Sequence, residues 1–570
     1  MRARIRATFA LLVAVAMAAV PAAPAAAAQA APATPPPGAA TQATPAAETL
    51  TGGELRLTLD EAVQRALENN ADLAVARFNP DLSEQNVFGA KGAFDPVFYS
   101  TLSRSSTDTE GTSAFSGGDV VNTKQNVWNF GTQVPLQPTG GTFTVDFNNF
   151  KRDTNNAFST LNPYYSSGLN ISLDQPLLRN FKVDSARNQL RIAKKNREIS
   201  DVQFRESILT TVAQVKIYYY QLIYSIDALA AAQKNLELAK RLLEENEIRV
   251  KVGTMAPLDV VQAQSEYAAR EEGVILAENA LAQAEDNLKE AIFAQNDPGM
   301  WSTRIVPADR PTAEPTPVNI DAAVRNALEN RTDIVAARKG LERSDYNVQY
   351  TRNQLLPDVN LFAGYGGAGA GGTQIVRDPP IGGDIVETIP GGYGDAVGEV
   401  FGGDFPTWRV GVQFAYAVPN RSAKAAAASA RISKEQALAS FRRLELNVAA
   451  EVRTAARGVE SGFKRVQSTG AARTLATQRL DAEEKKFAAG MSTNFLVTQA
   501  QRDLADAESA ELRAIAEYRI SLVNFQRVQE AGLSSAGGAA VLSTGGGSQA
   551  TQALQSSAAS AAVQGQSGGF

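Results

Sequence analysis

The sequence predicts a mixed α and β fold built from two similar halves, each with β-strands followed by a very long helical hairpin. Three observations lead to this prediction. A short helical signature occurs twice, segments with alternating apolar residues follow each copy, and helical patterns of unusual length come next. A chain of 570 residues would ordinarily suggest about four domains, but the internal repeat favours two equivalent halves.

The beginning of the chain has the composition of an export signal. A basic segment, MRARIR, precedes an apolar stretch that is too short to span a bilayer, and small residues follow it. We therefore expect residues 1–30 to be a signal peptide and the mature protein to be exported. Residues 31–53, rich in Ala, Pro and Thr, are predicted to be a disordered linker, and residues 532–570 a low-complexity tail.

The composition argues against several kinds of function. Lys and Arg total 55 against 60 for Asp and Glu, so we expect no basic surface for nucleic acid. The chain contains no cysteine and no histidine, which excludes disulfides, histidine proton relays and the common zinc-ligand sets. We expect no catalytic residues, no metal site, no cofactor and no transmembrane helix, since no later apolar run approaches ~20 residues.

The two halves begin with the same signature. Residues 57–77, LTLDEAVQRALENNADLAVAR, match residues 318–338, VNIDAAVRNALENRTDIVAAR, at an offset of 261. Each signature predicts a short helix that is followed by a second helix. We therefore assign residues 54–317 to the first structural repeat and residues 318–531 to the second.

Segments with alternating apolar residues follow these short helices. We predict strands at residues 94–106, 126–136, 142–150, 168–177, 358–366 and 408–418, with a glycine-rich loop at 367–404. Period-two segments of this length with aromatic residues at their ends fit the strands of a membrane β-barrel, and a soluble sandwich is the alternative. The first half holds 24 extra residues before its helical tip, which could form an extra hairpin or a longer surface loop.

Each half continues with a helix of exceptional length. Neither Gly nor Pro occurs between Pro176 and Gly253, so residues 184–250 are predicted to form one helix of ~100 Å. Apolar residues along this helix are spaced alternately three and four apart, which predicts coiled-coil packing against neighbouring helices.

The two long helices end in the same short motif. Residues 250–264, VKVGTMAPLDVVQAQ, align with residues 487–501, FAAGMSTNFLVTQAQ, at an offset of 237, so that Gly253 coincides with Gly490. A glycine directly after a long helix supplies the left-handed conformation that ends it, and Pro257 can begin the next helix. This explanation accounts for the tip residues structurally, and it is compatible with a docking surface at the tips.

Neither part of this fold can be complete in one chain. A long helix with one narrow apolar seam must lie beside other helices. A membrane sheet must close, because unpaired backbone groups cannot face lipid. Four to six strands in one chain are fewer than the ~8 of the smallest single-chain barrels. We therefore expect several copies of the chain to contribute to one barrel.

Taken together, the duplicated signature, the paired tips and the order of strands and helices over residues 55–531 resemble the TolC family of outer-membrane efflux proteins. Residues 391–421 are similar to the family's second barrel loop and strand. The resemblance implies a homotrimer, whose β-barrel crosses the lipid of the outer membrane and continues as a long α-helical coiled-coil barrel in the periplasm.

The same resemblance implies a function. We expect an outer-membrane exit channel for efflux or secretion, which docks a periplasmic adaptor protein and an inner-membrane pump through its helical tips and is not an enzyme. The alternative is a barrel-anchored coiled-coil stalk with a structural or adhesive role and no transport. The second copy of the hairpin and its matching tip favour the channel, because a stalk needs neither.

The resemblance also assigns candidate roles to tip residues. The adaptor-docking candidates are Val252, Gly253, Thr254, Ala489, Gly490 and Met491. The aperture and gating candidates are Asp259, Phe487, Ser492, Leu496 and Gln499. The family's tip aspartate corresponds to Asp259, but the tyrosine and arginine that hold it correspond to Phe487 and Ser492. Because Phe487 has no hydroxyl, we predict an apolar or amide-lined constriction in place of a salt-bridge lock.

Overall fold

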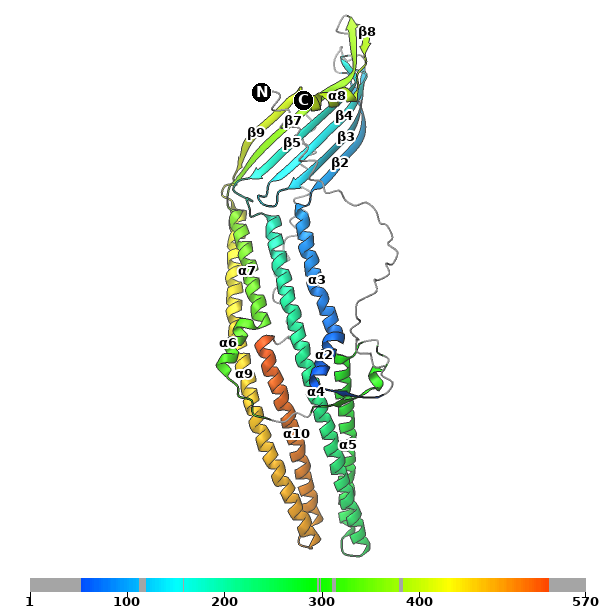
Figure 1. Ribbon diagram of the computed structural model, residues 1–570, viewed down its shortest axis with the longest axis vertical. Helices are drawn as coiled ribbons and strands as arrows, with labels where there is room; N and C mark the ends of the chain where they lie inside the picture. The colour runs from blue at the N-terminus through cyan, green and yellow to red at the C-terminus, as the bar shows by residue number, and fades with distance from the viewer. Residues whose placement is uncertain are drawn as a thin grey trace, which may run out of the picture. The chain divides into compact units, whose positions relative to one another are not determined.

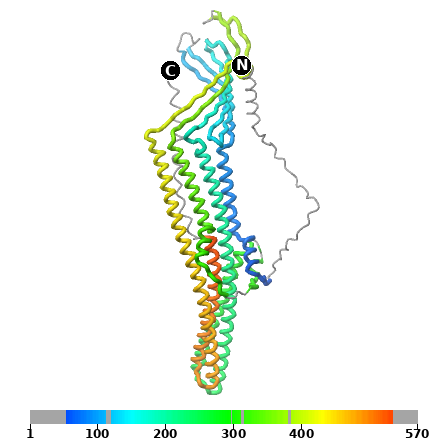
Figure 2. Tube along the Cα trace, turned by 60° about the vertical axis from the view of Figure 1, so that its left-hand side comes forward, coloured from blue at the N-terminus to red at the C-terminus, as the bar shows by residue number. Residues whose placement is uncertain are grey.

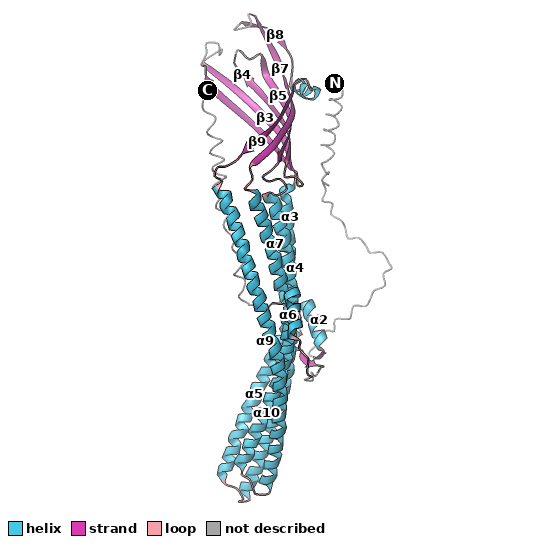
Figure 3. Cartoon of the chain, turned by 90° about the vertical axis from the view of Figure 1, so that its left-hand side faces the viewer, coloured by secondary structure: helices cyan, strands magenta, loops and turns pink. Residues whose placement is uncertain are grey.

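The computed structural model describes residues 53–111, 119–156, 158–294, 297, 299–309, 314–378 and 383–532. The predicted signal peptide and nearly all of the predicted linker and tail lie outside these residues. In the unit that begins at Thr51, an antiparallel sheet lies at one end of a set of long helices (Figure 1). Strands and helices are segregated along this unit, apart from a small strand pair beside the helices and one short helix beside the sheet (Figure 3).

The repeated signature forms a pair of helices in each half, as predicted. These helices are α2 (Leu59–Asn69), α3 (Ala71–Lys91), α6 (Ile320–Asn330) and α7 (Thr332–Asn353). Thr58 caps α2 in a capping box with Glu61, and the side chain of Asn319 caps α6 by accepting a hydrogen bond from the backbone of Ala322. A parallel strand pair, β1 (Glu54–Leu57) and β6 (Arg304–Pro307), joins the two ends of the first half.

Among the described residues, the large sheet has one short strand, β8 (Asp384–Ile389), and six long strands. They are β2 (Val97–Glu110), β3 (Val120–Pro135), β4 (Thr142–Thr154), β5 (Leu161–Pro176), β7 (Asp358–Asp378) and β9 (Pro406–Ala415). Neighbouring strands are antiparallel in the order β2-β3-β4-β5-β7, and β9 pairs with the other side of β7. The first half thus supplies two hairpins, β2–β3 and β4–β5, and the second half supplies one, β7–β9. The extra residues of the first half therefore form an additional hairpin rather than a longer loop. Within the described residues, β2 forms one open edge, and β9 forms the other together with the short β8, which pairs with the last part of β7.

One part of the predicted second half was wrong. The glycine-rich segment 367–404 is not a loop, because β7 continues to Asp378 and is followed by β8 (Asp384–Ile389) and α8 (Tyr393–Gly402). The glycines of β7 serve packing rather than flexibility. A Cβ on Gly369 would lie 1.9 Å from the carbonyl oxygen of Ala396, so only glycine allows α8 to approach the strand this closely.

The strand register gives the sheet two chemically distinct faces. One, the apolar face, carries Phe130, Phe143, Val145, Phe147, Leu169, Ile171, Leu173, Leu361, Trp408, Val410, Val412 and Phe414. The other, the polar face, carries Asn129, Gln133, Thr144, Asp146, Asn148, Asn170, Ser172, Asp174, Asn360, Arg409 and Gln413. This alternation is typical of a sheet with lipid on one side and water on the other.

Two long helical hairpins extend from the sheet. The first hairpin consists of α4 (Ser185–Lys251) and α5 (Pro257–Ile292), and the second of α9 (Arg421–Ala488) and α10 (Asn494–Glu530). α4 begins and ends within one residue of its predicted bounds. The predicted seam is buried in its central part, where Val215 and Tyr219 of α4 are both fully buried. In the described part of the chain, no helix is both long and apolar enough to cross a membrane.

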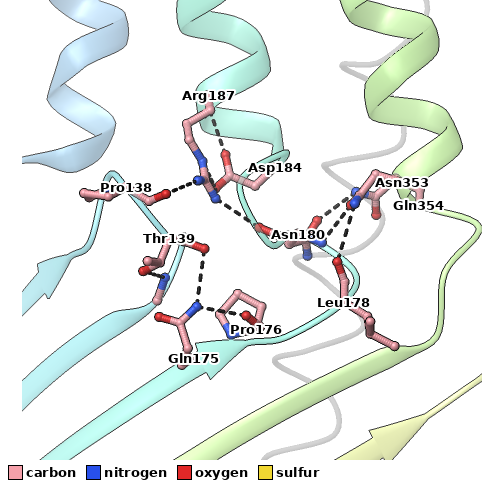
Figure 4. A network of polar contacts seen from close by, with 11 residues as sticks. Pro138, Thr139, Gln175, Pro176, Leu178, Asn180, Asp184, Arg187, Asn353 and Gln354 are labelled. Atoms are coloured by element: carbon pink, nitrogen blue, oxygen red, sulfur yellow. Dashed lines mark hydrogen bonds and ion pairs between the residues drawn. The ribbon is translucent and has the colours of Figure 1, made fainter.

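A polar network fastens the helices to the sheet (Figure 4). The guanidinium group of Arg187, in the first turn of α4, donates to the carbonyl oxygens of Pro138 (3.1 Å) and Asn180 (3.0 Å). It also donates to the carboxylate of Asp184 (2.8 Å), the residue that caps α4. The backbone N–H of Asn180 donates to the side chain of Asn353 at the end of α7 (2.8 Å). The network therefore joins both halves at the base of the sheet.

Candidate functional site

The two hairpin tips have the same backbone geometry. Gly253 and Gly490 adopt φ values of 79° and 74°, as expected for a glycine that ends a helix. The N–H of Thr254 donates to the carbonyl oxygen of Arg249 (2.9 Å), and the N–H of Met491 makes the equivalent bond to Lys486 (2.8 Å). Both tips are therefore Schellman turns, and the repeat seen in the sequence extends to their hydrogen bonds.

All six docking candidates lie on the surface of these turns. The side chains of Val252 and Met491 are 67% and 75% exposed. Nothing lies within 4 Å of the position that a Cβ would take on Gly253 or Gly490. Exposed apolar residues continue onto the next helices at Leu258 and Phe495. Each tip thus presents a low, open surface with apolar side chains around a glycine.

Buried amides hold the two tips side by side, and both tips lie at the end of the unit away from the sheet (Figure 2). The side chain of Asn246 on α4 donates to that of Asn494 on α10 (2.9 Å). Asn494 in turn donates to the backbone carbonyl oxygen of Asp259 on α5 (3.4 Å). Asn246 and Asn494 are almost completely buried, so the bond between them forms out of contact with water.

A second contact joins the hairpins through an ion pair. The carboxylate of Glu266 on α5 is buried and accepts hydrogen bonds from Arg502 on α10 (2.8 Å) and from Arg270 on its own helix (2.8 Å). Burial acts to raise the pKa of Glu266, but the two arginines outweigh it and hold the pKa below its ordinary value. Glu266 is therefore ionised at neutral pH although it lies between helices.

The gating candidates do not form one cluster. Phe487 is buried among Leu242, Leu480 and Val497, and its ring lies 4.2 Å from the guanidinium group of Arg249. The Asp259 carboxylate makes no hydrogen bond or ion pair with the residues that the structure describes, and its bond to the second hairpin is made by its backbone carbonyl oxygen.

The remaining candidates lie on the second hairpin. Ser492 donates to Glu483 (2.8 Å), whose pKa is held below its usual range by Lys486 and Ser492. The amide of Gln499 donates to Asp503 (2.8 Å), and the Leu496 side chain is partly exposed.

The residues that join the hairpins could not be recognised from the sequence. Asn246, Asn494, Glu266 and Arg502 occur in helical patterns where charged and amide residues ordinarily lie on a solvated face. Only the spacing of Glu266 and Arg270, four residues apart, was a visible signal. In the described ranges, no group of three or more acidic side chains is arranged to hold a metal ion.

A two-faced antiparallel sheet that continues into paired helical hairpins defines the class of outer-membrane channels with a helical extension. The chain matches the family model described as outer membrane efflux protein over residues 62–292 and 323–528, which is well over half of its length. The chain therefore belongs to the outer membrane efflux protein family.

Individual relatives agree with this assignment. "Outer membrane protein TolC" of Vibrio cholerae serotype O1 is 22% identical over 335 residues, which cover 59% of this chain and 71% of the relative. The solved outer-membrane channel OprN superposes with a TM-score of 0.59 at 20% identity, covering 83% of this chain and 90% of OprN. The Campylobacter jejuni CmeC outer membrane channel gives 0.57 at 17% identity, with 83% and 85% covered.

These findings confirm the predicted family and location. The protein is an outer-membrane efflux channel of the TolC type, with its sheet in the outer membrane and its helices extending into the periplasm. The apolar face of the sheet therefore contacts lipid, because the polar face could not do so without desolvating its side chains.

Proposed function

We propose that this protein is the exit duct of a tripartite export system, in which its helical tips dock a periplasmic adaptor that connects it to an inner-membrane pump. The observation that carries this proposal is the pair of equivalent, exposed tips at the far end of helices of 67 and 68 residues. Helices of that length span ~100 Å, so the tips lie deep in the periplasm, where an adaptor anchored at the inner membrane can reach them.

The surface of the tips suits a protein partner. Val252 and Met491 are largely exposed beside glycines that leave the turns flat, and Leu258 adds a side chain that is 76% exposed. Apolar side chains of this kind on a rigid turn favour burial against another protein. In this proposal the six docking candidates contact the adaptor directly, and the two tips of one copy offer it two similar sites.

The proposal includes a homotrimer that closes the sheet. Strand β9 runs antiparallel to β7 and has the direction needed to pair with β2 of a second copy, so each open edge has a complementary edge. Three copies of six long strands make a barrel of eighteen strands. Barrels of about 16–18 strands enclose an aqueous channel, and the polar face would line it.

We propose further that packing and amide hydrogen bonds, rather than a salt-bridge lock at Asp259, keep the tips together when the channel is closed. Phe487 serves this closure through its buried ring and its contact with Arg249. Leu496 and Gln499 would line the aperture without a ring of acidic groups. Single-channel current should therefore resist block by submillimolar multivalent cations, and strong block at such concentrations would contradict this part of the proposal.

Two experiments test the proposal. Purified protein in a planar bilayer should form trimers that conduct ions, at least after the tips are loosened by Asn494→Ala. Loosened trimers that never conduct would favour the alternative of a barrel-anchored stalk without transport.

The chain contains no cysteine, so a single cysteine can be placed at Met491 and used for crosslinking in cells. Met491→Cys should crosslink to a periplasmic adaptor identified by mass spectrometry. The matched control Ile432→Cys, which is 60% exposed on α9 far from the tip, should not. Equal adaptor crosslinking at both positions would contradict docking at the tips.

A further inference from the structure

Helix α8 (Tyr393–Gly402) lies on the apolar face of the sheet, toward the end away from the long helices (Figure 1). Its backbone meets β7 at alternate residues of that face. A Cβ on Gly371 would lie 2.2 Å from the carbonyl oxygen of Gly392, and a Cβ on Gly367 would lie 3.1 Å from that of Val400. Glycines at every second position of β7 therefore form a flat seat for the helix.

Specific contacts fix α8 on this seat. The hydroxyl of Tyr393 donates to the side chain of Asn149 (3.0 Å), which is fully buried, and its ring packs edge-on against Trp128 at 5.3 Å between centroids. At the other end of the helix, the carboxylate of Glu399 accepts a hydrogen bond from the backbone N–H of Ala370 (2.9 Å). α8 is thus an integral part of the outer surface of the sheet.

Large apolar side chains are exposed on the free side of α8 and in the segment after it, with the exposed Asp404 between two of them. Phe401 is 57% exposed and Phe405 is 59% exposed, and Trp408 follows on the apolar face of β9 with 76% of its surface exposed. These aromatic side chains extend the apolar face of the sheet, which contacts lipid. α8 packs on glycines of the apolar face, so the residues of the polar face lie on the opposite side of the sheet.

The position of α8 along the strands corresponds to a membrane boundary. β7 pairs with β9 from Asp358 to Gly367, about ten residues, and a tilted membrane strand needs about 9–11 residues to cross the hydrocarbon. α8 lies at the end of this stretch that is away from the long helices, where the rings of Trp128 and Tyr393 are in contact. Trp and Tyr concentrate at the interface between acyl chains and headgroups.

We propose that α8 is a lipid-binding interfacial helix, which lies on the outside of the sheet at the acyl-chain boundary of the outer leaflet and inserts Phe401 and Phe405 among the acyl chains. The occupant of this surface is lipid, since the surface is continuous with the lipid-contacting face of the sheet. Apolar side chains on a helix parallel to the membrane bind at this depth. The helix thereby sets the depth of the sheet in the membrane, independently of what the channel transports.

Fluorescence quenching in vesicles tests this proposal. The full-length protein has no native cysteine, so Phe401→Cys can carry one environment-sensitive fluorophore. Val412→Cys on the apolar face and Val386→Cys on β8 are matched controls, since both native side chains are 61% exposed. The proteins are placed in phosphatidylcholine vesicles that carry nitroxide either near the headgroup or near the end of the acyl chain, and iodide serves as the aqueous quencher.

The ratio of lipid quenching to iodide quenching should be several-fold higher at position 401 than at position 386. The shallow nitroxide should quench position 401 more than the deep one, and the order should be reversed at position 412. Quenching at 401 by iodide alone, as at 386, would overturn the proposal. Protection from all three quenchers would overturn it as well, because it would indicate a protein partner. Phe405→Cys should repeat the result for position 401, and it replaces that variant if the label there prevents insertion.

Discussion

Replacing Arg502 with alanine removes the ion pair that joins the first hairpin to the second hairpin near their tips. The Glu266 side chain is only 4% exposed, and the side chain of Arg502 is 50% exposed. The variant leaves Glu266 with Arg270 as its one arginine partner on its own helix. The buried carboxylate then loses its link to α10, and the contact between the hairpins becomes weaker.

The size of this loss follows from the burial of the two groups. Breaking a fully buried ion pair costs about 3–5 kcal/mol, and a hydrogen bond to a charged group contributes about 1.5–3 kcal/mol. Because water reaches half of the Arg502 side chain, we take a lower figure of about 1–2 kcal/mol. That free energy raises the ratio of separated to joined tips by a factor of about 5–30.

Electron paramagnetic resonance measures this ratio directly. Spin labels on Leu258→Cys and Phe495→Cys, both exposed, report the distance between α5 and α10, with labelled chains diluted among unlabelled ones. Arg502→Ala should add a population at longer distance. The control Arg465→Ala breaks a half-exposed ion pair within the second hairpin and should leave the distance unchanged. An unaltered distance distribution in Arg502→Ala would refute the assignment of Glu266 and Arg502 as a tie between hairpins.

Three further predictions concern stability. Gly490→Ala should lower the free energy of unfolding by about 1 kcal/mol in denaturant titrations, because an L-residue is strained at the positive φ of this position. Gly458→Ala in the middle of α9 should raise it by up to about 1 kcal/mol, because alanine favours a helix more than glycine and has room there. Arg187→Ala should cost about 3 kcal/mol by the same measurement, and Arg187→Lys should recover less than half, since lysine cannot reproduce the forked contacts. The pKa of Glu266 is lower in the folded protein than in the unfolded chain, so its carboxylate stabilises the fold fully above the unfolded pKa of about 4.3, and this stabilisation is lost as the pH falls through the folded pKa. The distribution of distances between the two tips should therefore broaden over that pH range. In Glu266→Gln it should not change with pH.

Local signals explain what could be predicted from the sequence. The bounds of α4 were accurate because a run without Gly or Pro, ended by a glycine, describes a helix without reference to the rest of the fold. The geometry at Gly253 and Gly490 followed from the same local rule. The short helices that begin after Thr58 and Asn319 were likewise predicted from residues that lie close together in the sequence.

What the sequence did not reveal depends on tertiary contact. The glycines of β7 suggested a loop, and only the approach of α8 shows why a strand needs them. The hydrogen bonds from Asn246 to Asn494 and from Arg502 to Glu266 join residues more than 200 positions apart, and no periodicity predicts them. The role of the six exposed tip residues in docking stays a prediction, because geometry shows their exposure and not their partner.

The seam between β5 and β7 has a consequence for how the chain folds. Leu169 pairs with Gly367, so this seam joins residues about 200 positions apart, with the whole first hairpin between them. The strands β2 to β5 can form as a meander through short connections, but β7 cannot join them until the whole first hairpin and the beginning of the second half have been synthesised. Contacts of such long range are slow to form. We therefore expect the first helical hairpin to fold before the sheet is complete, so that insertion into the membrane is a late step.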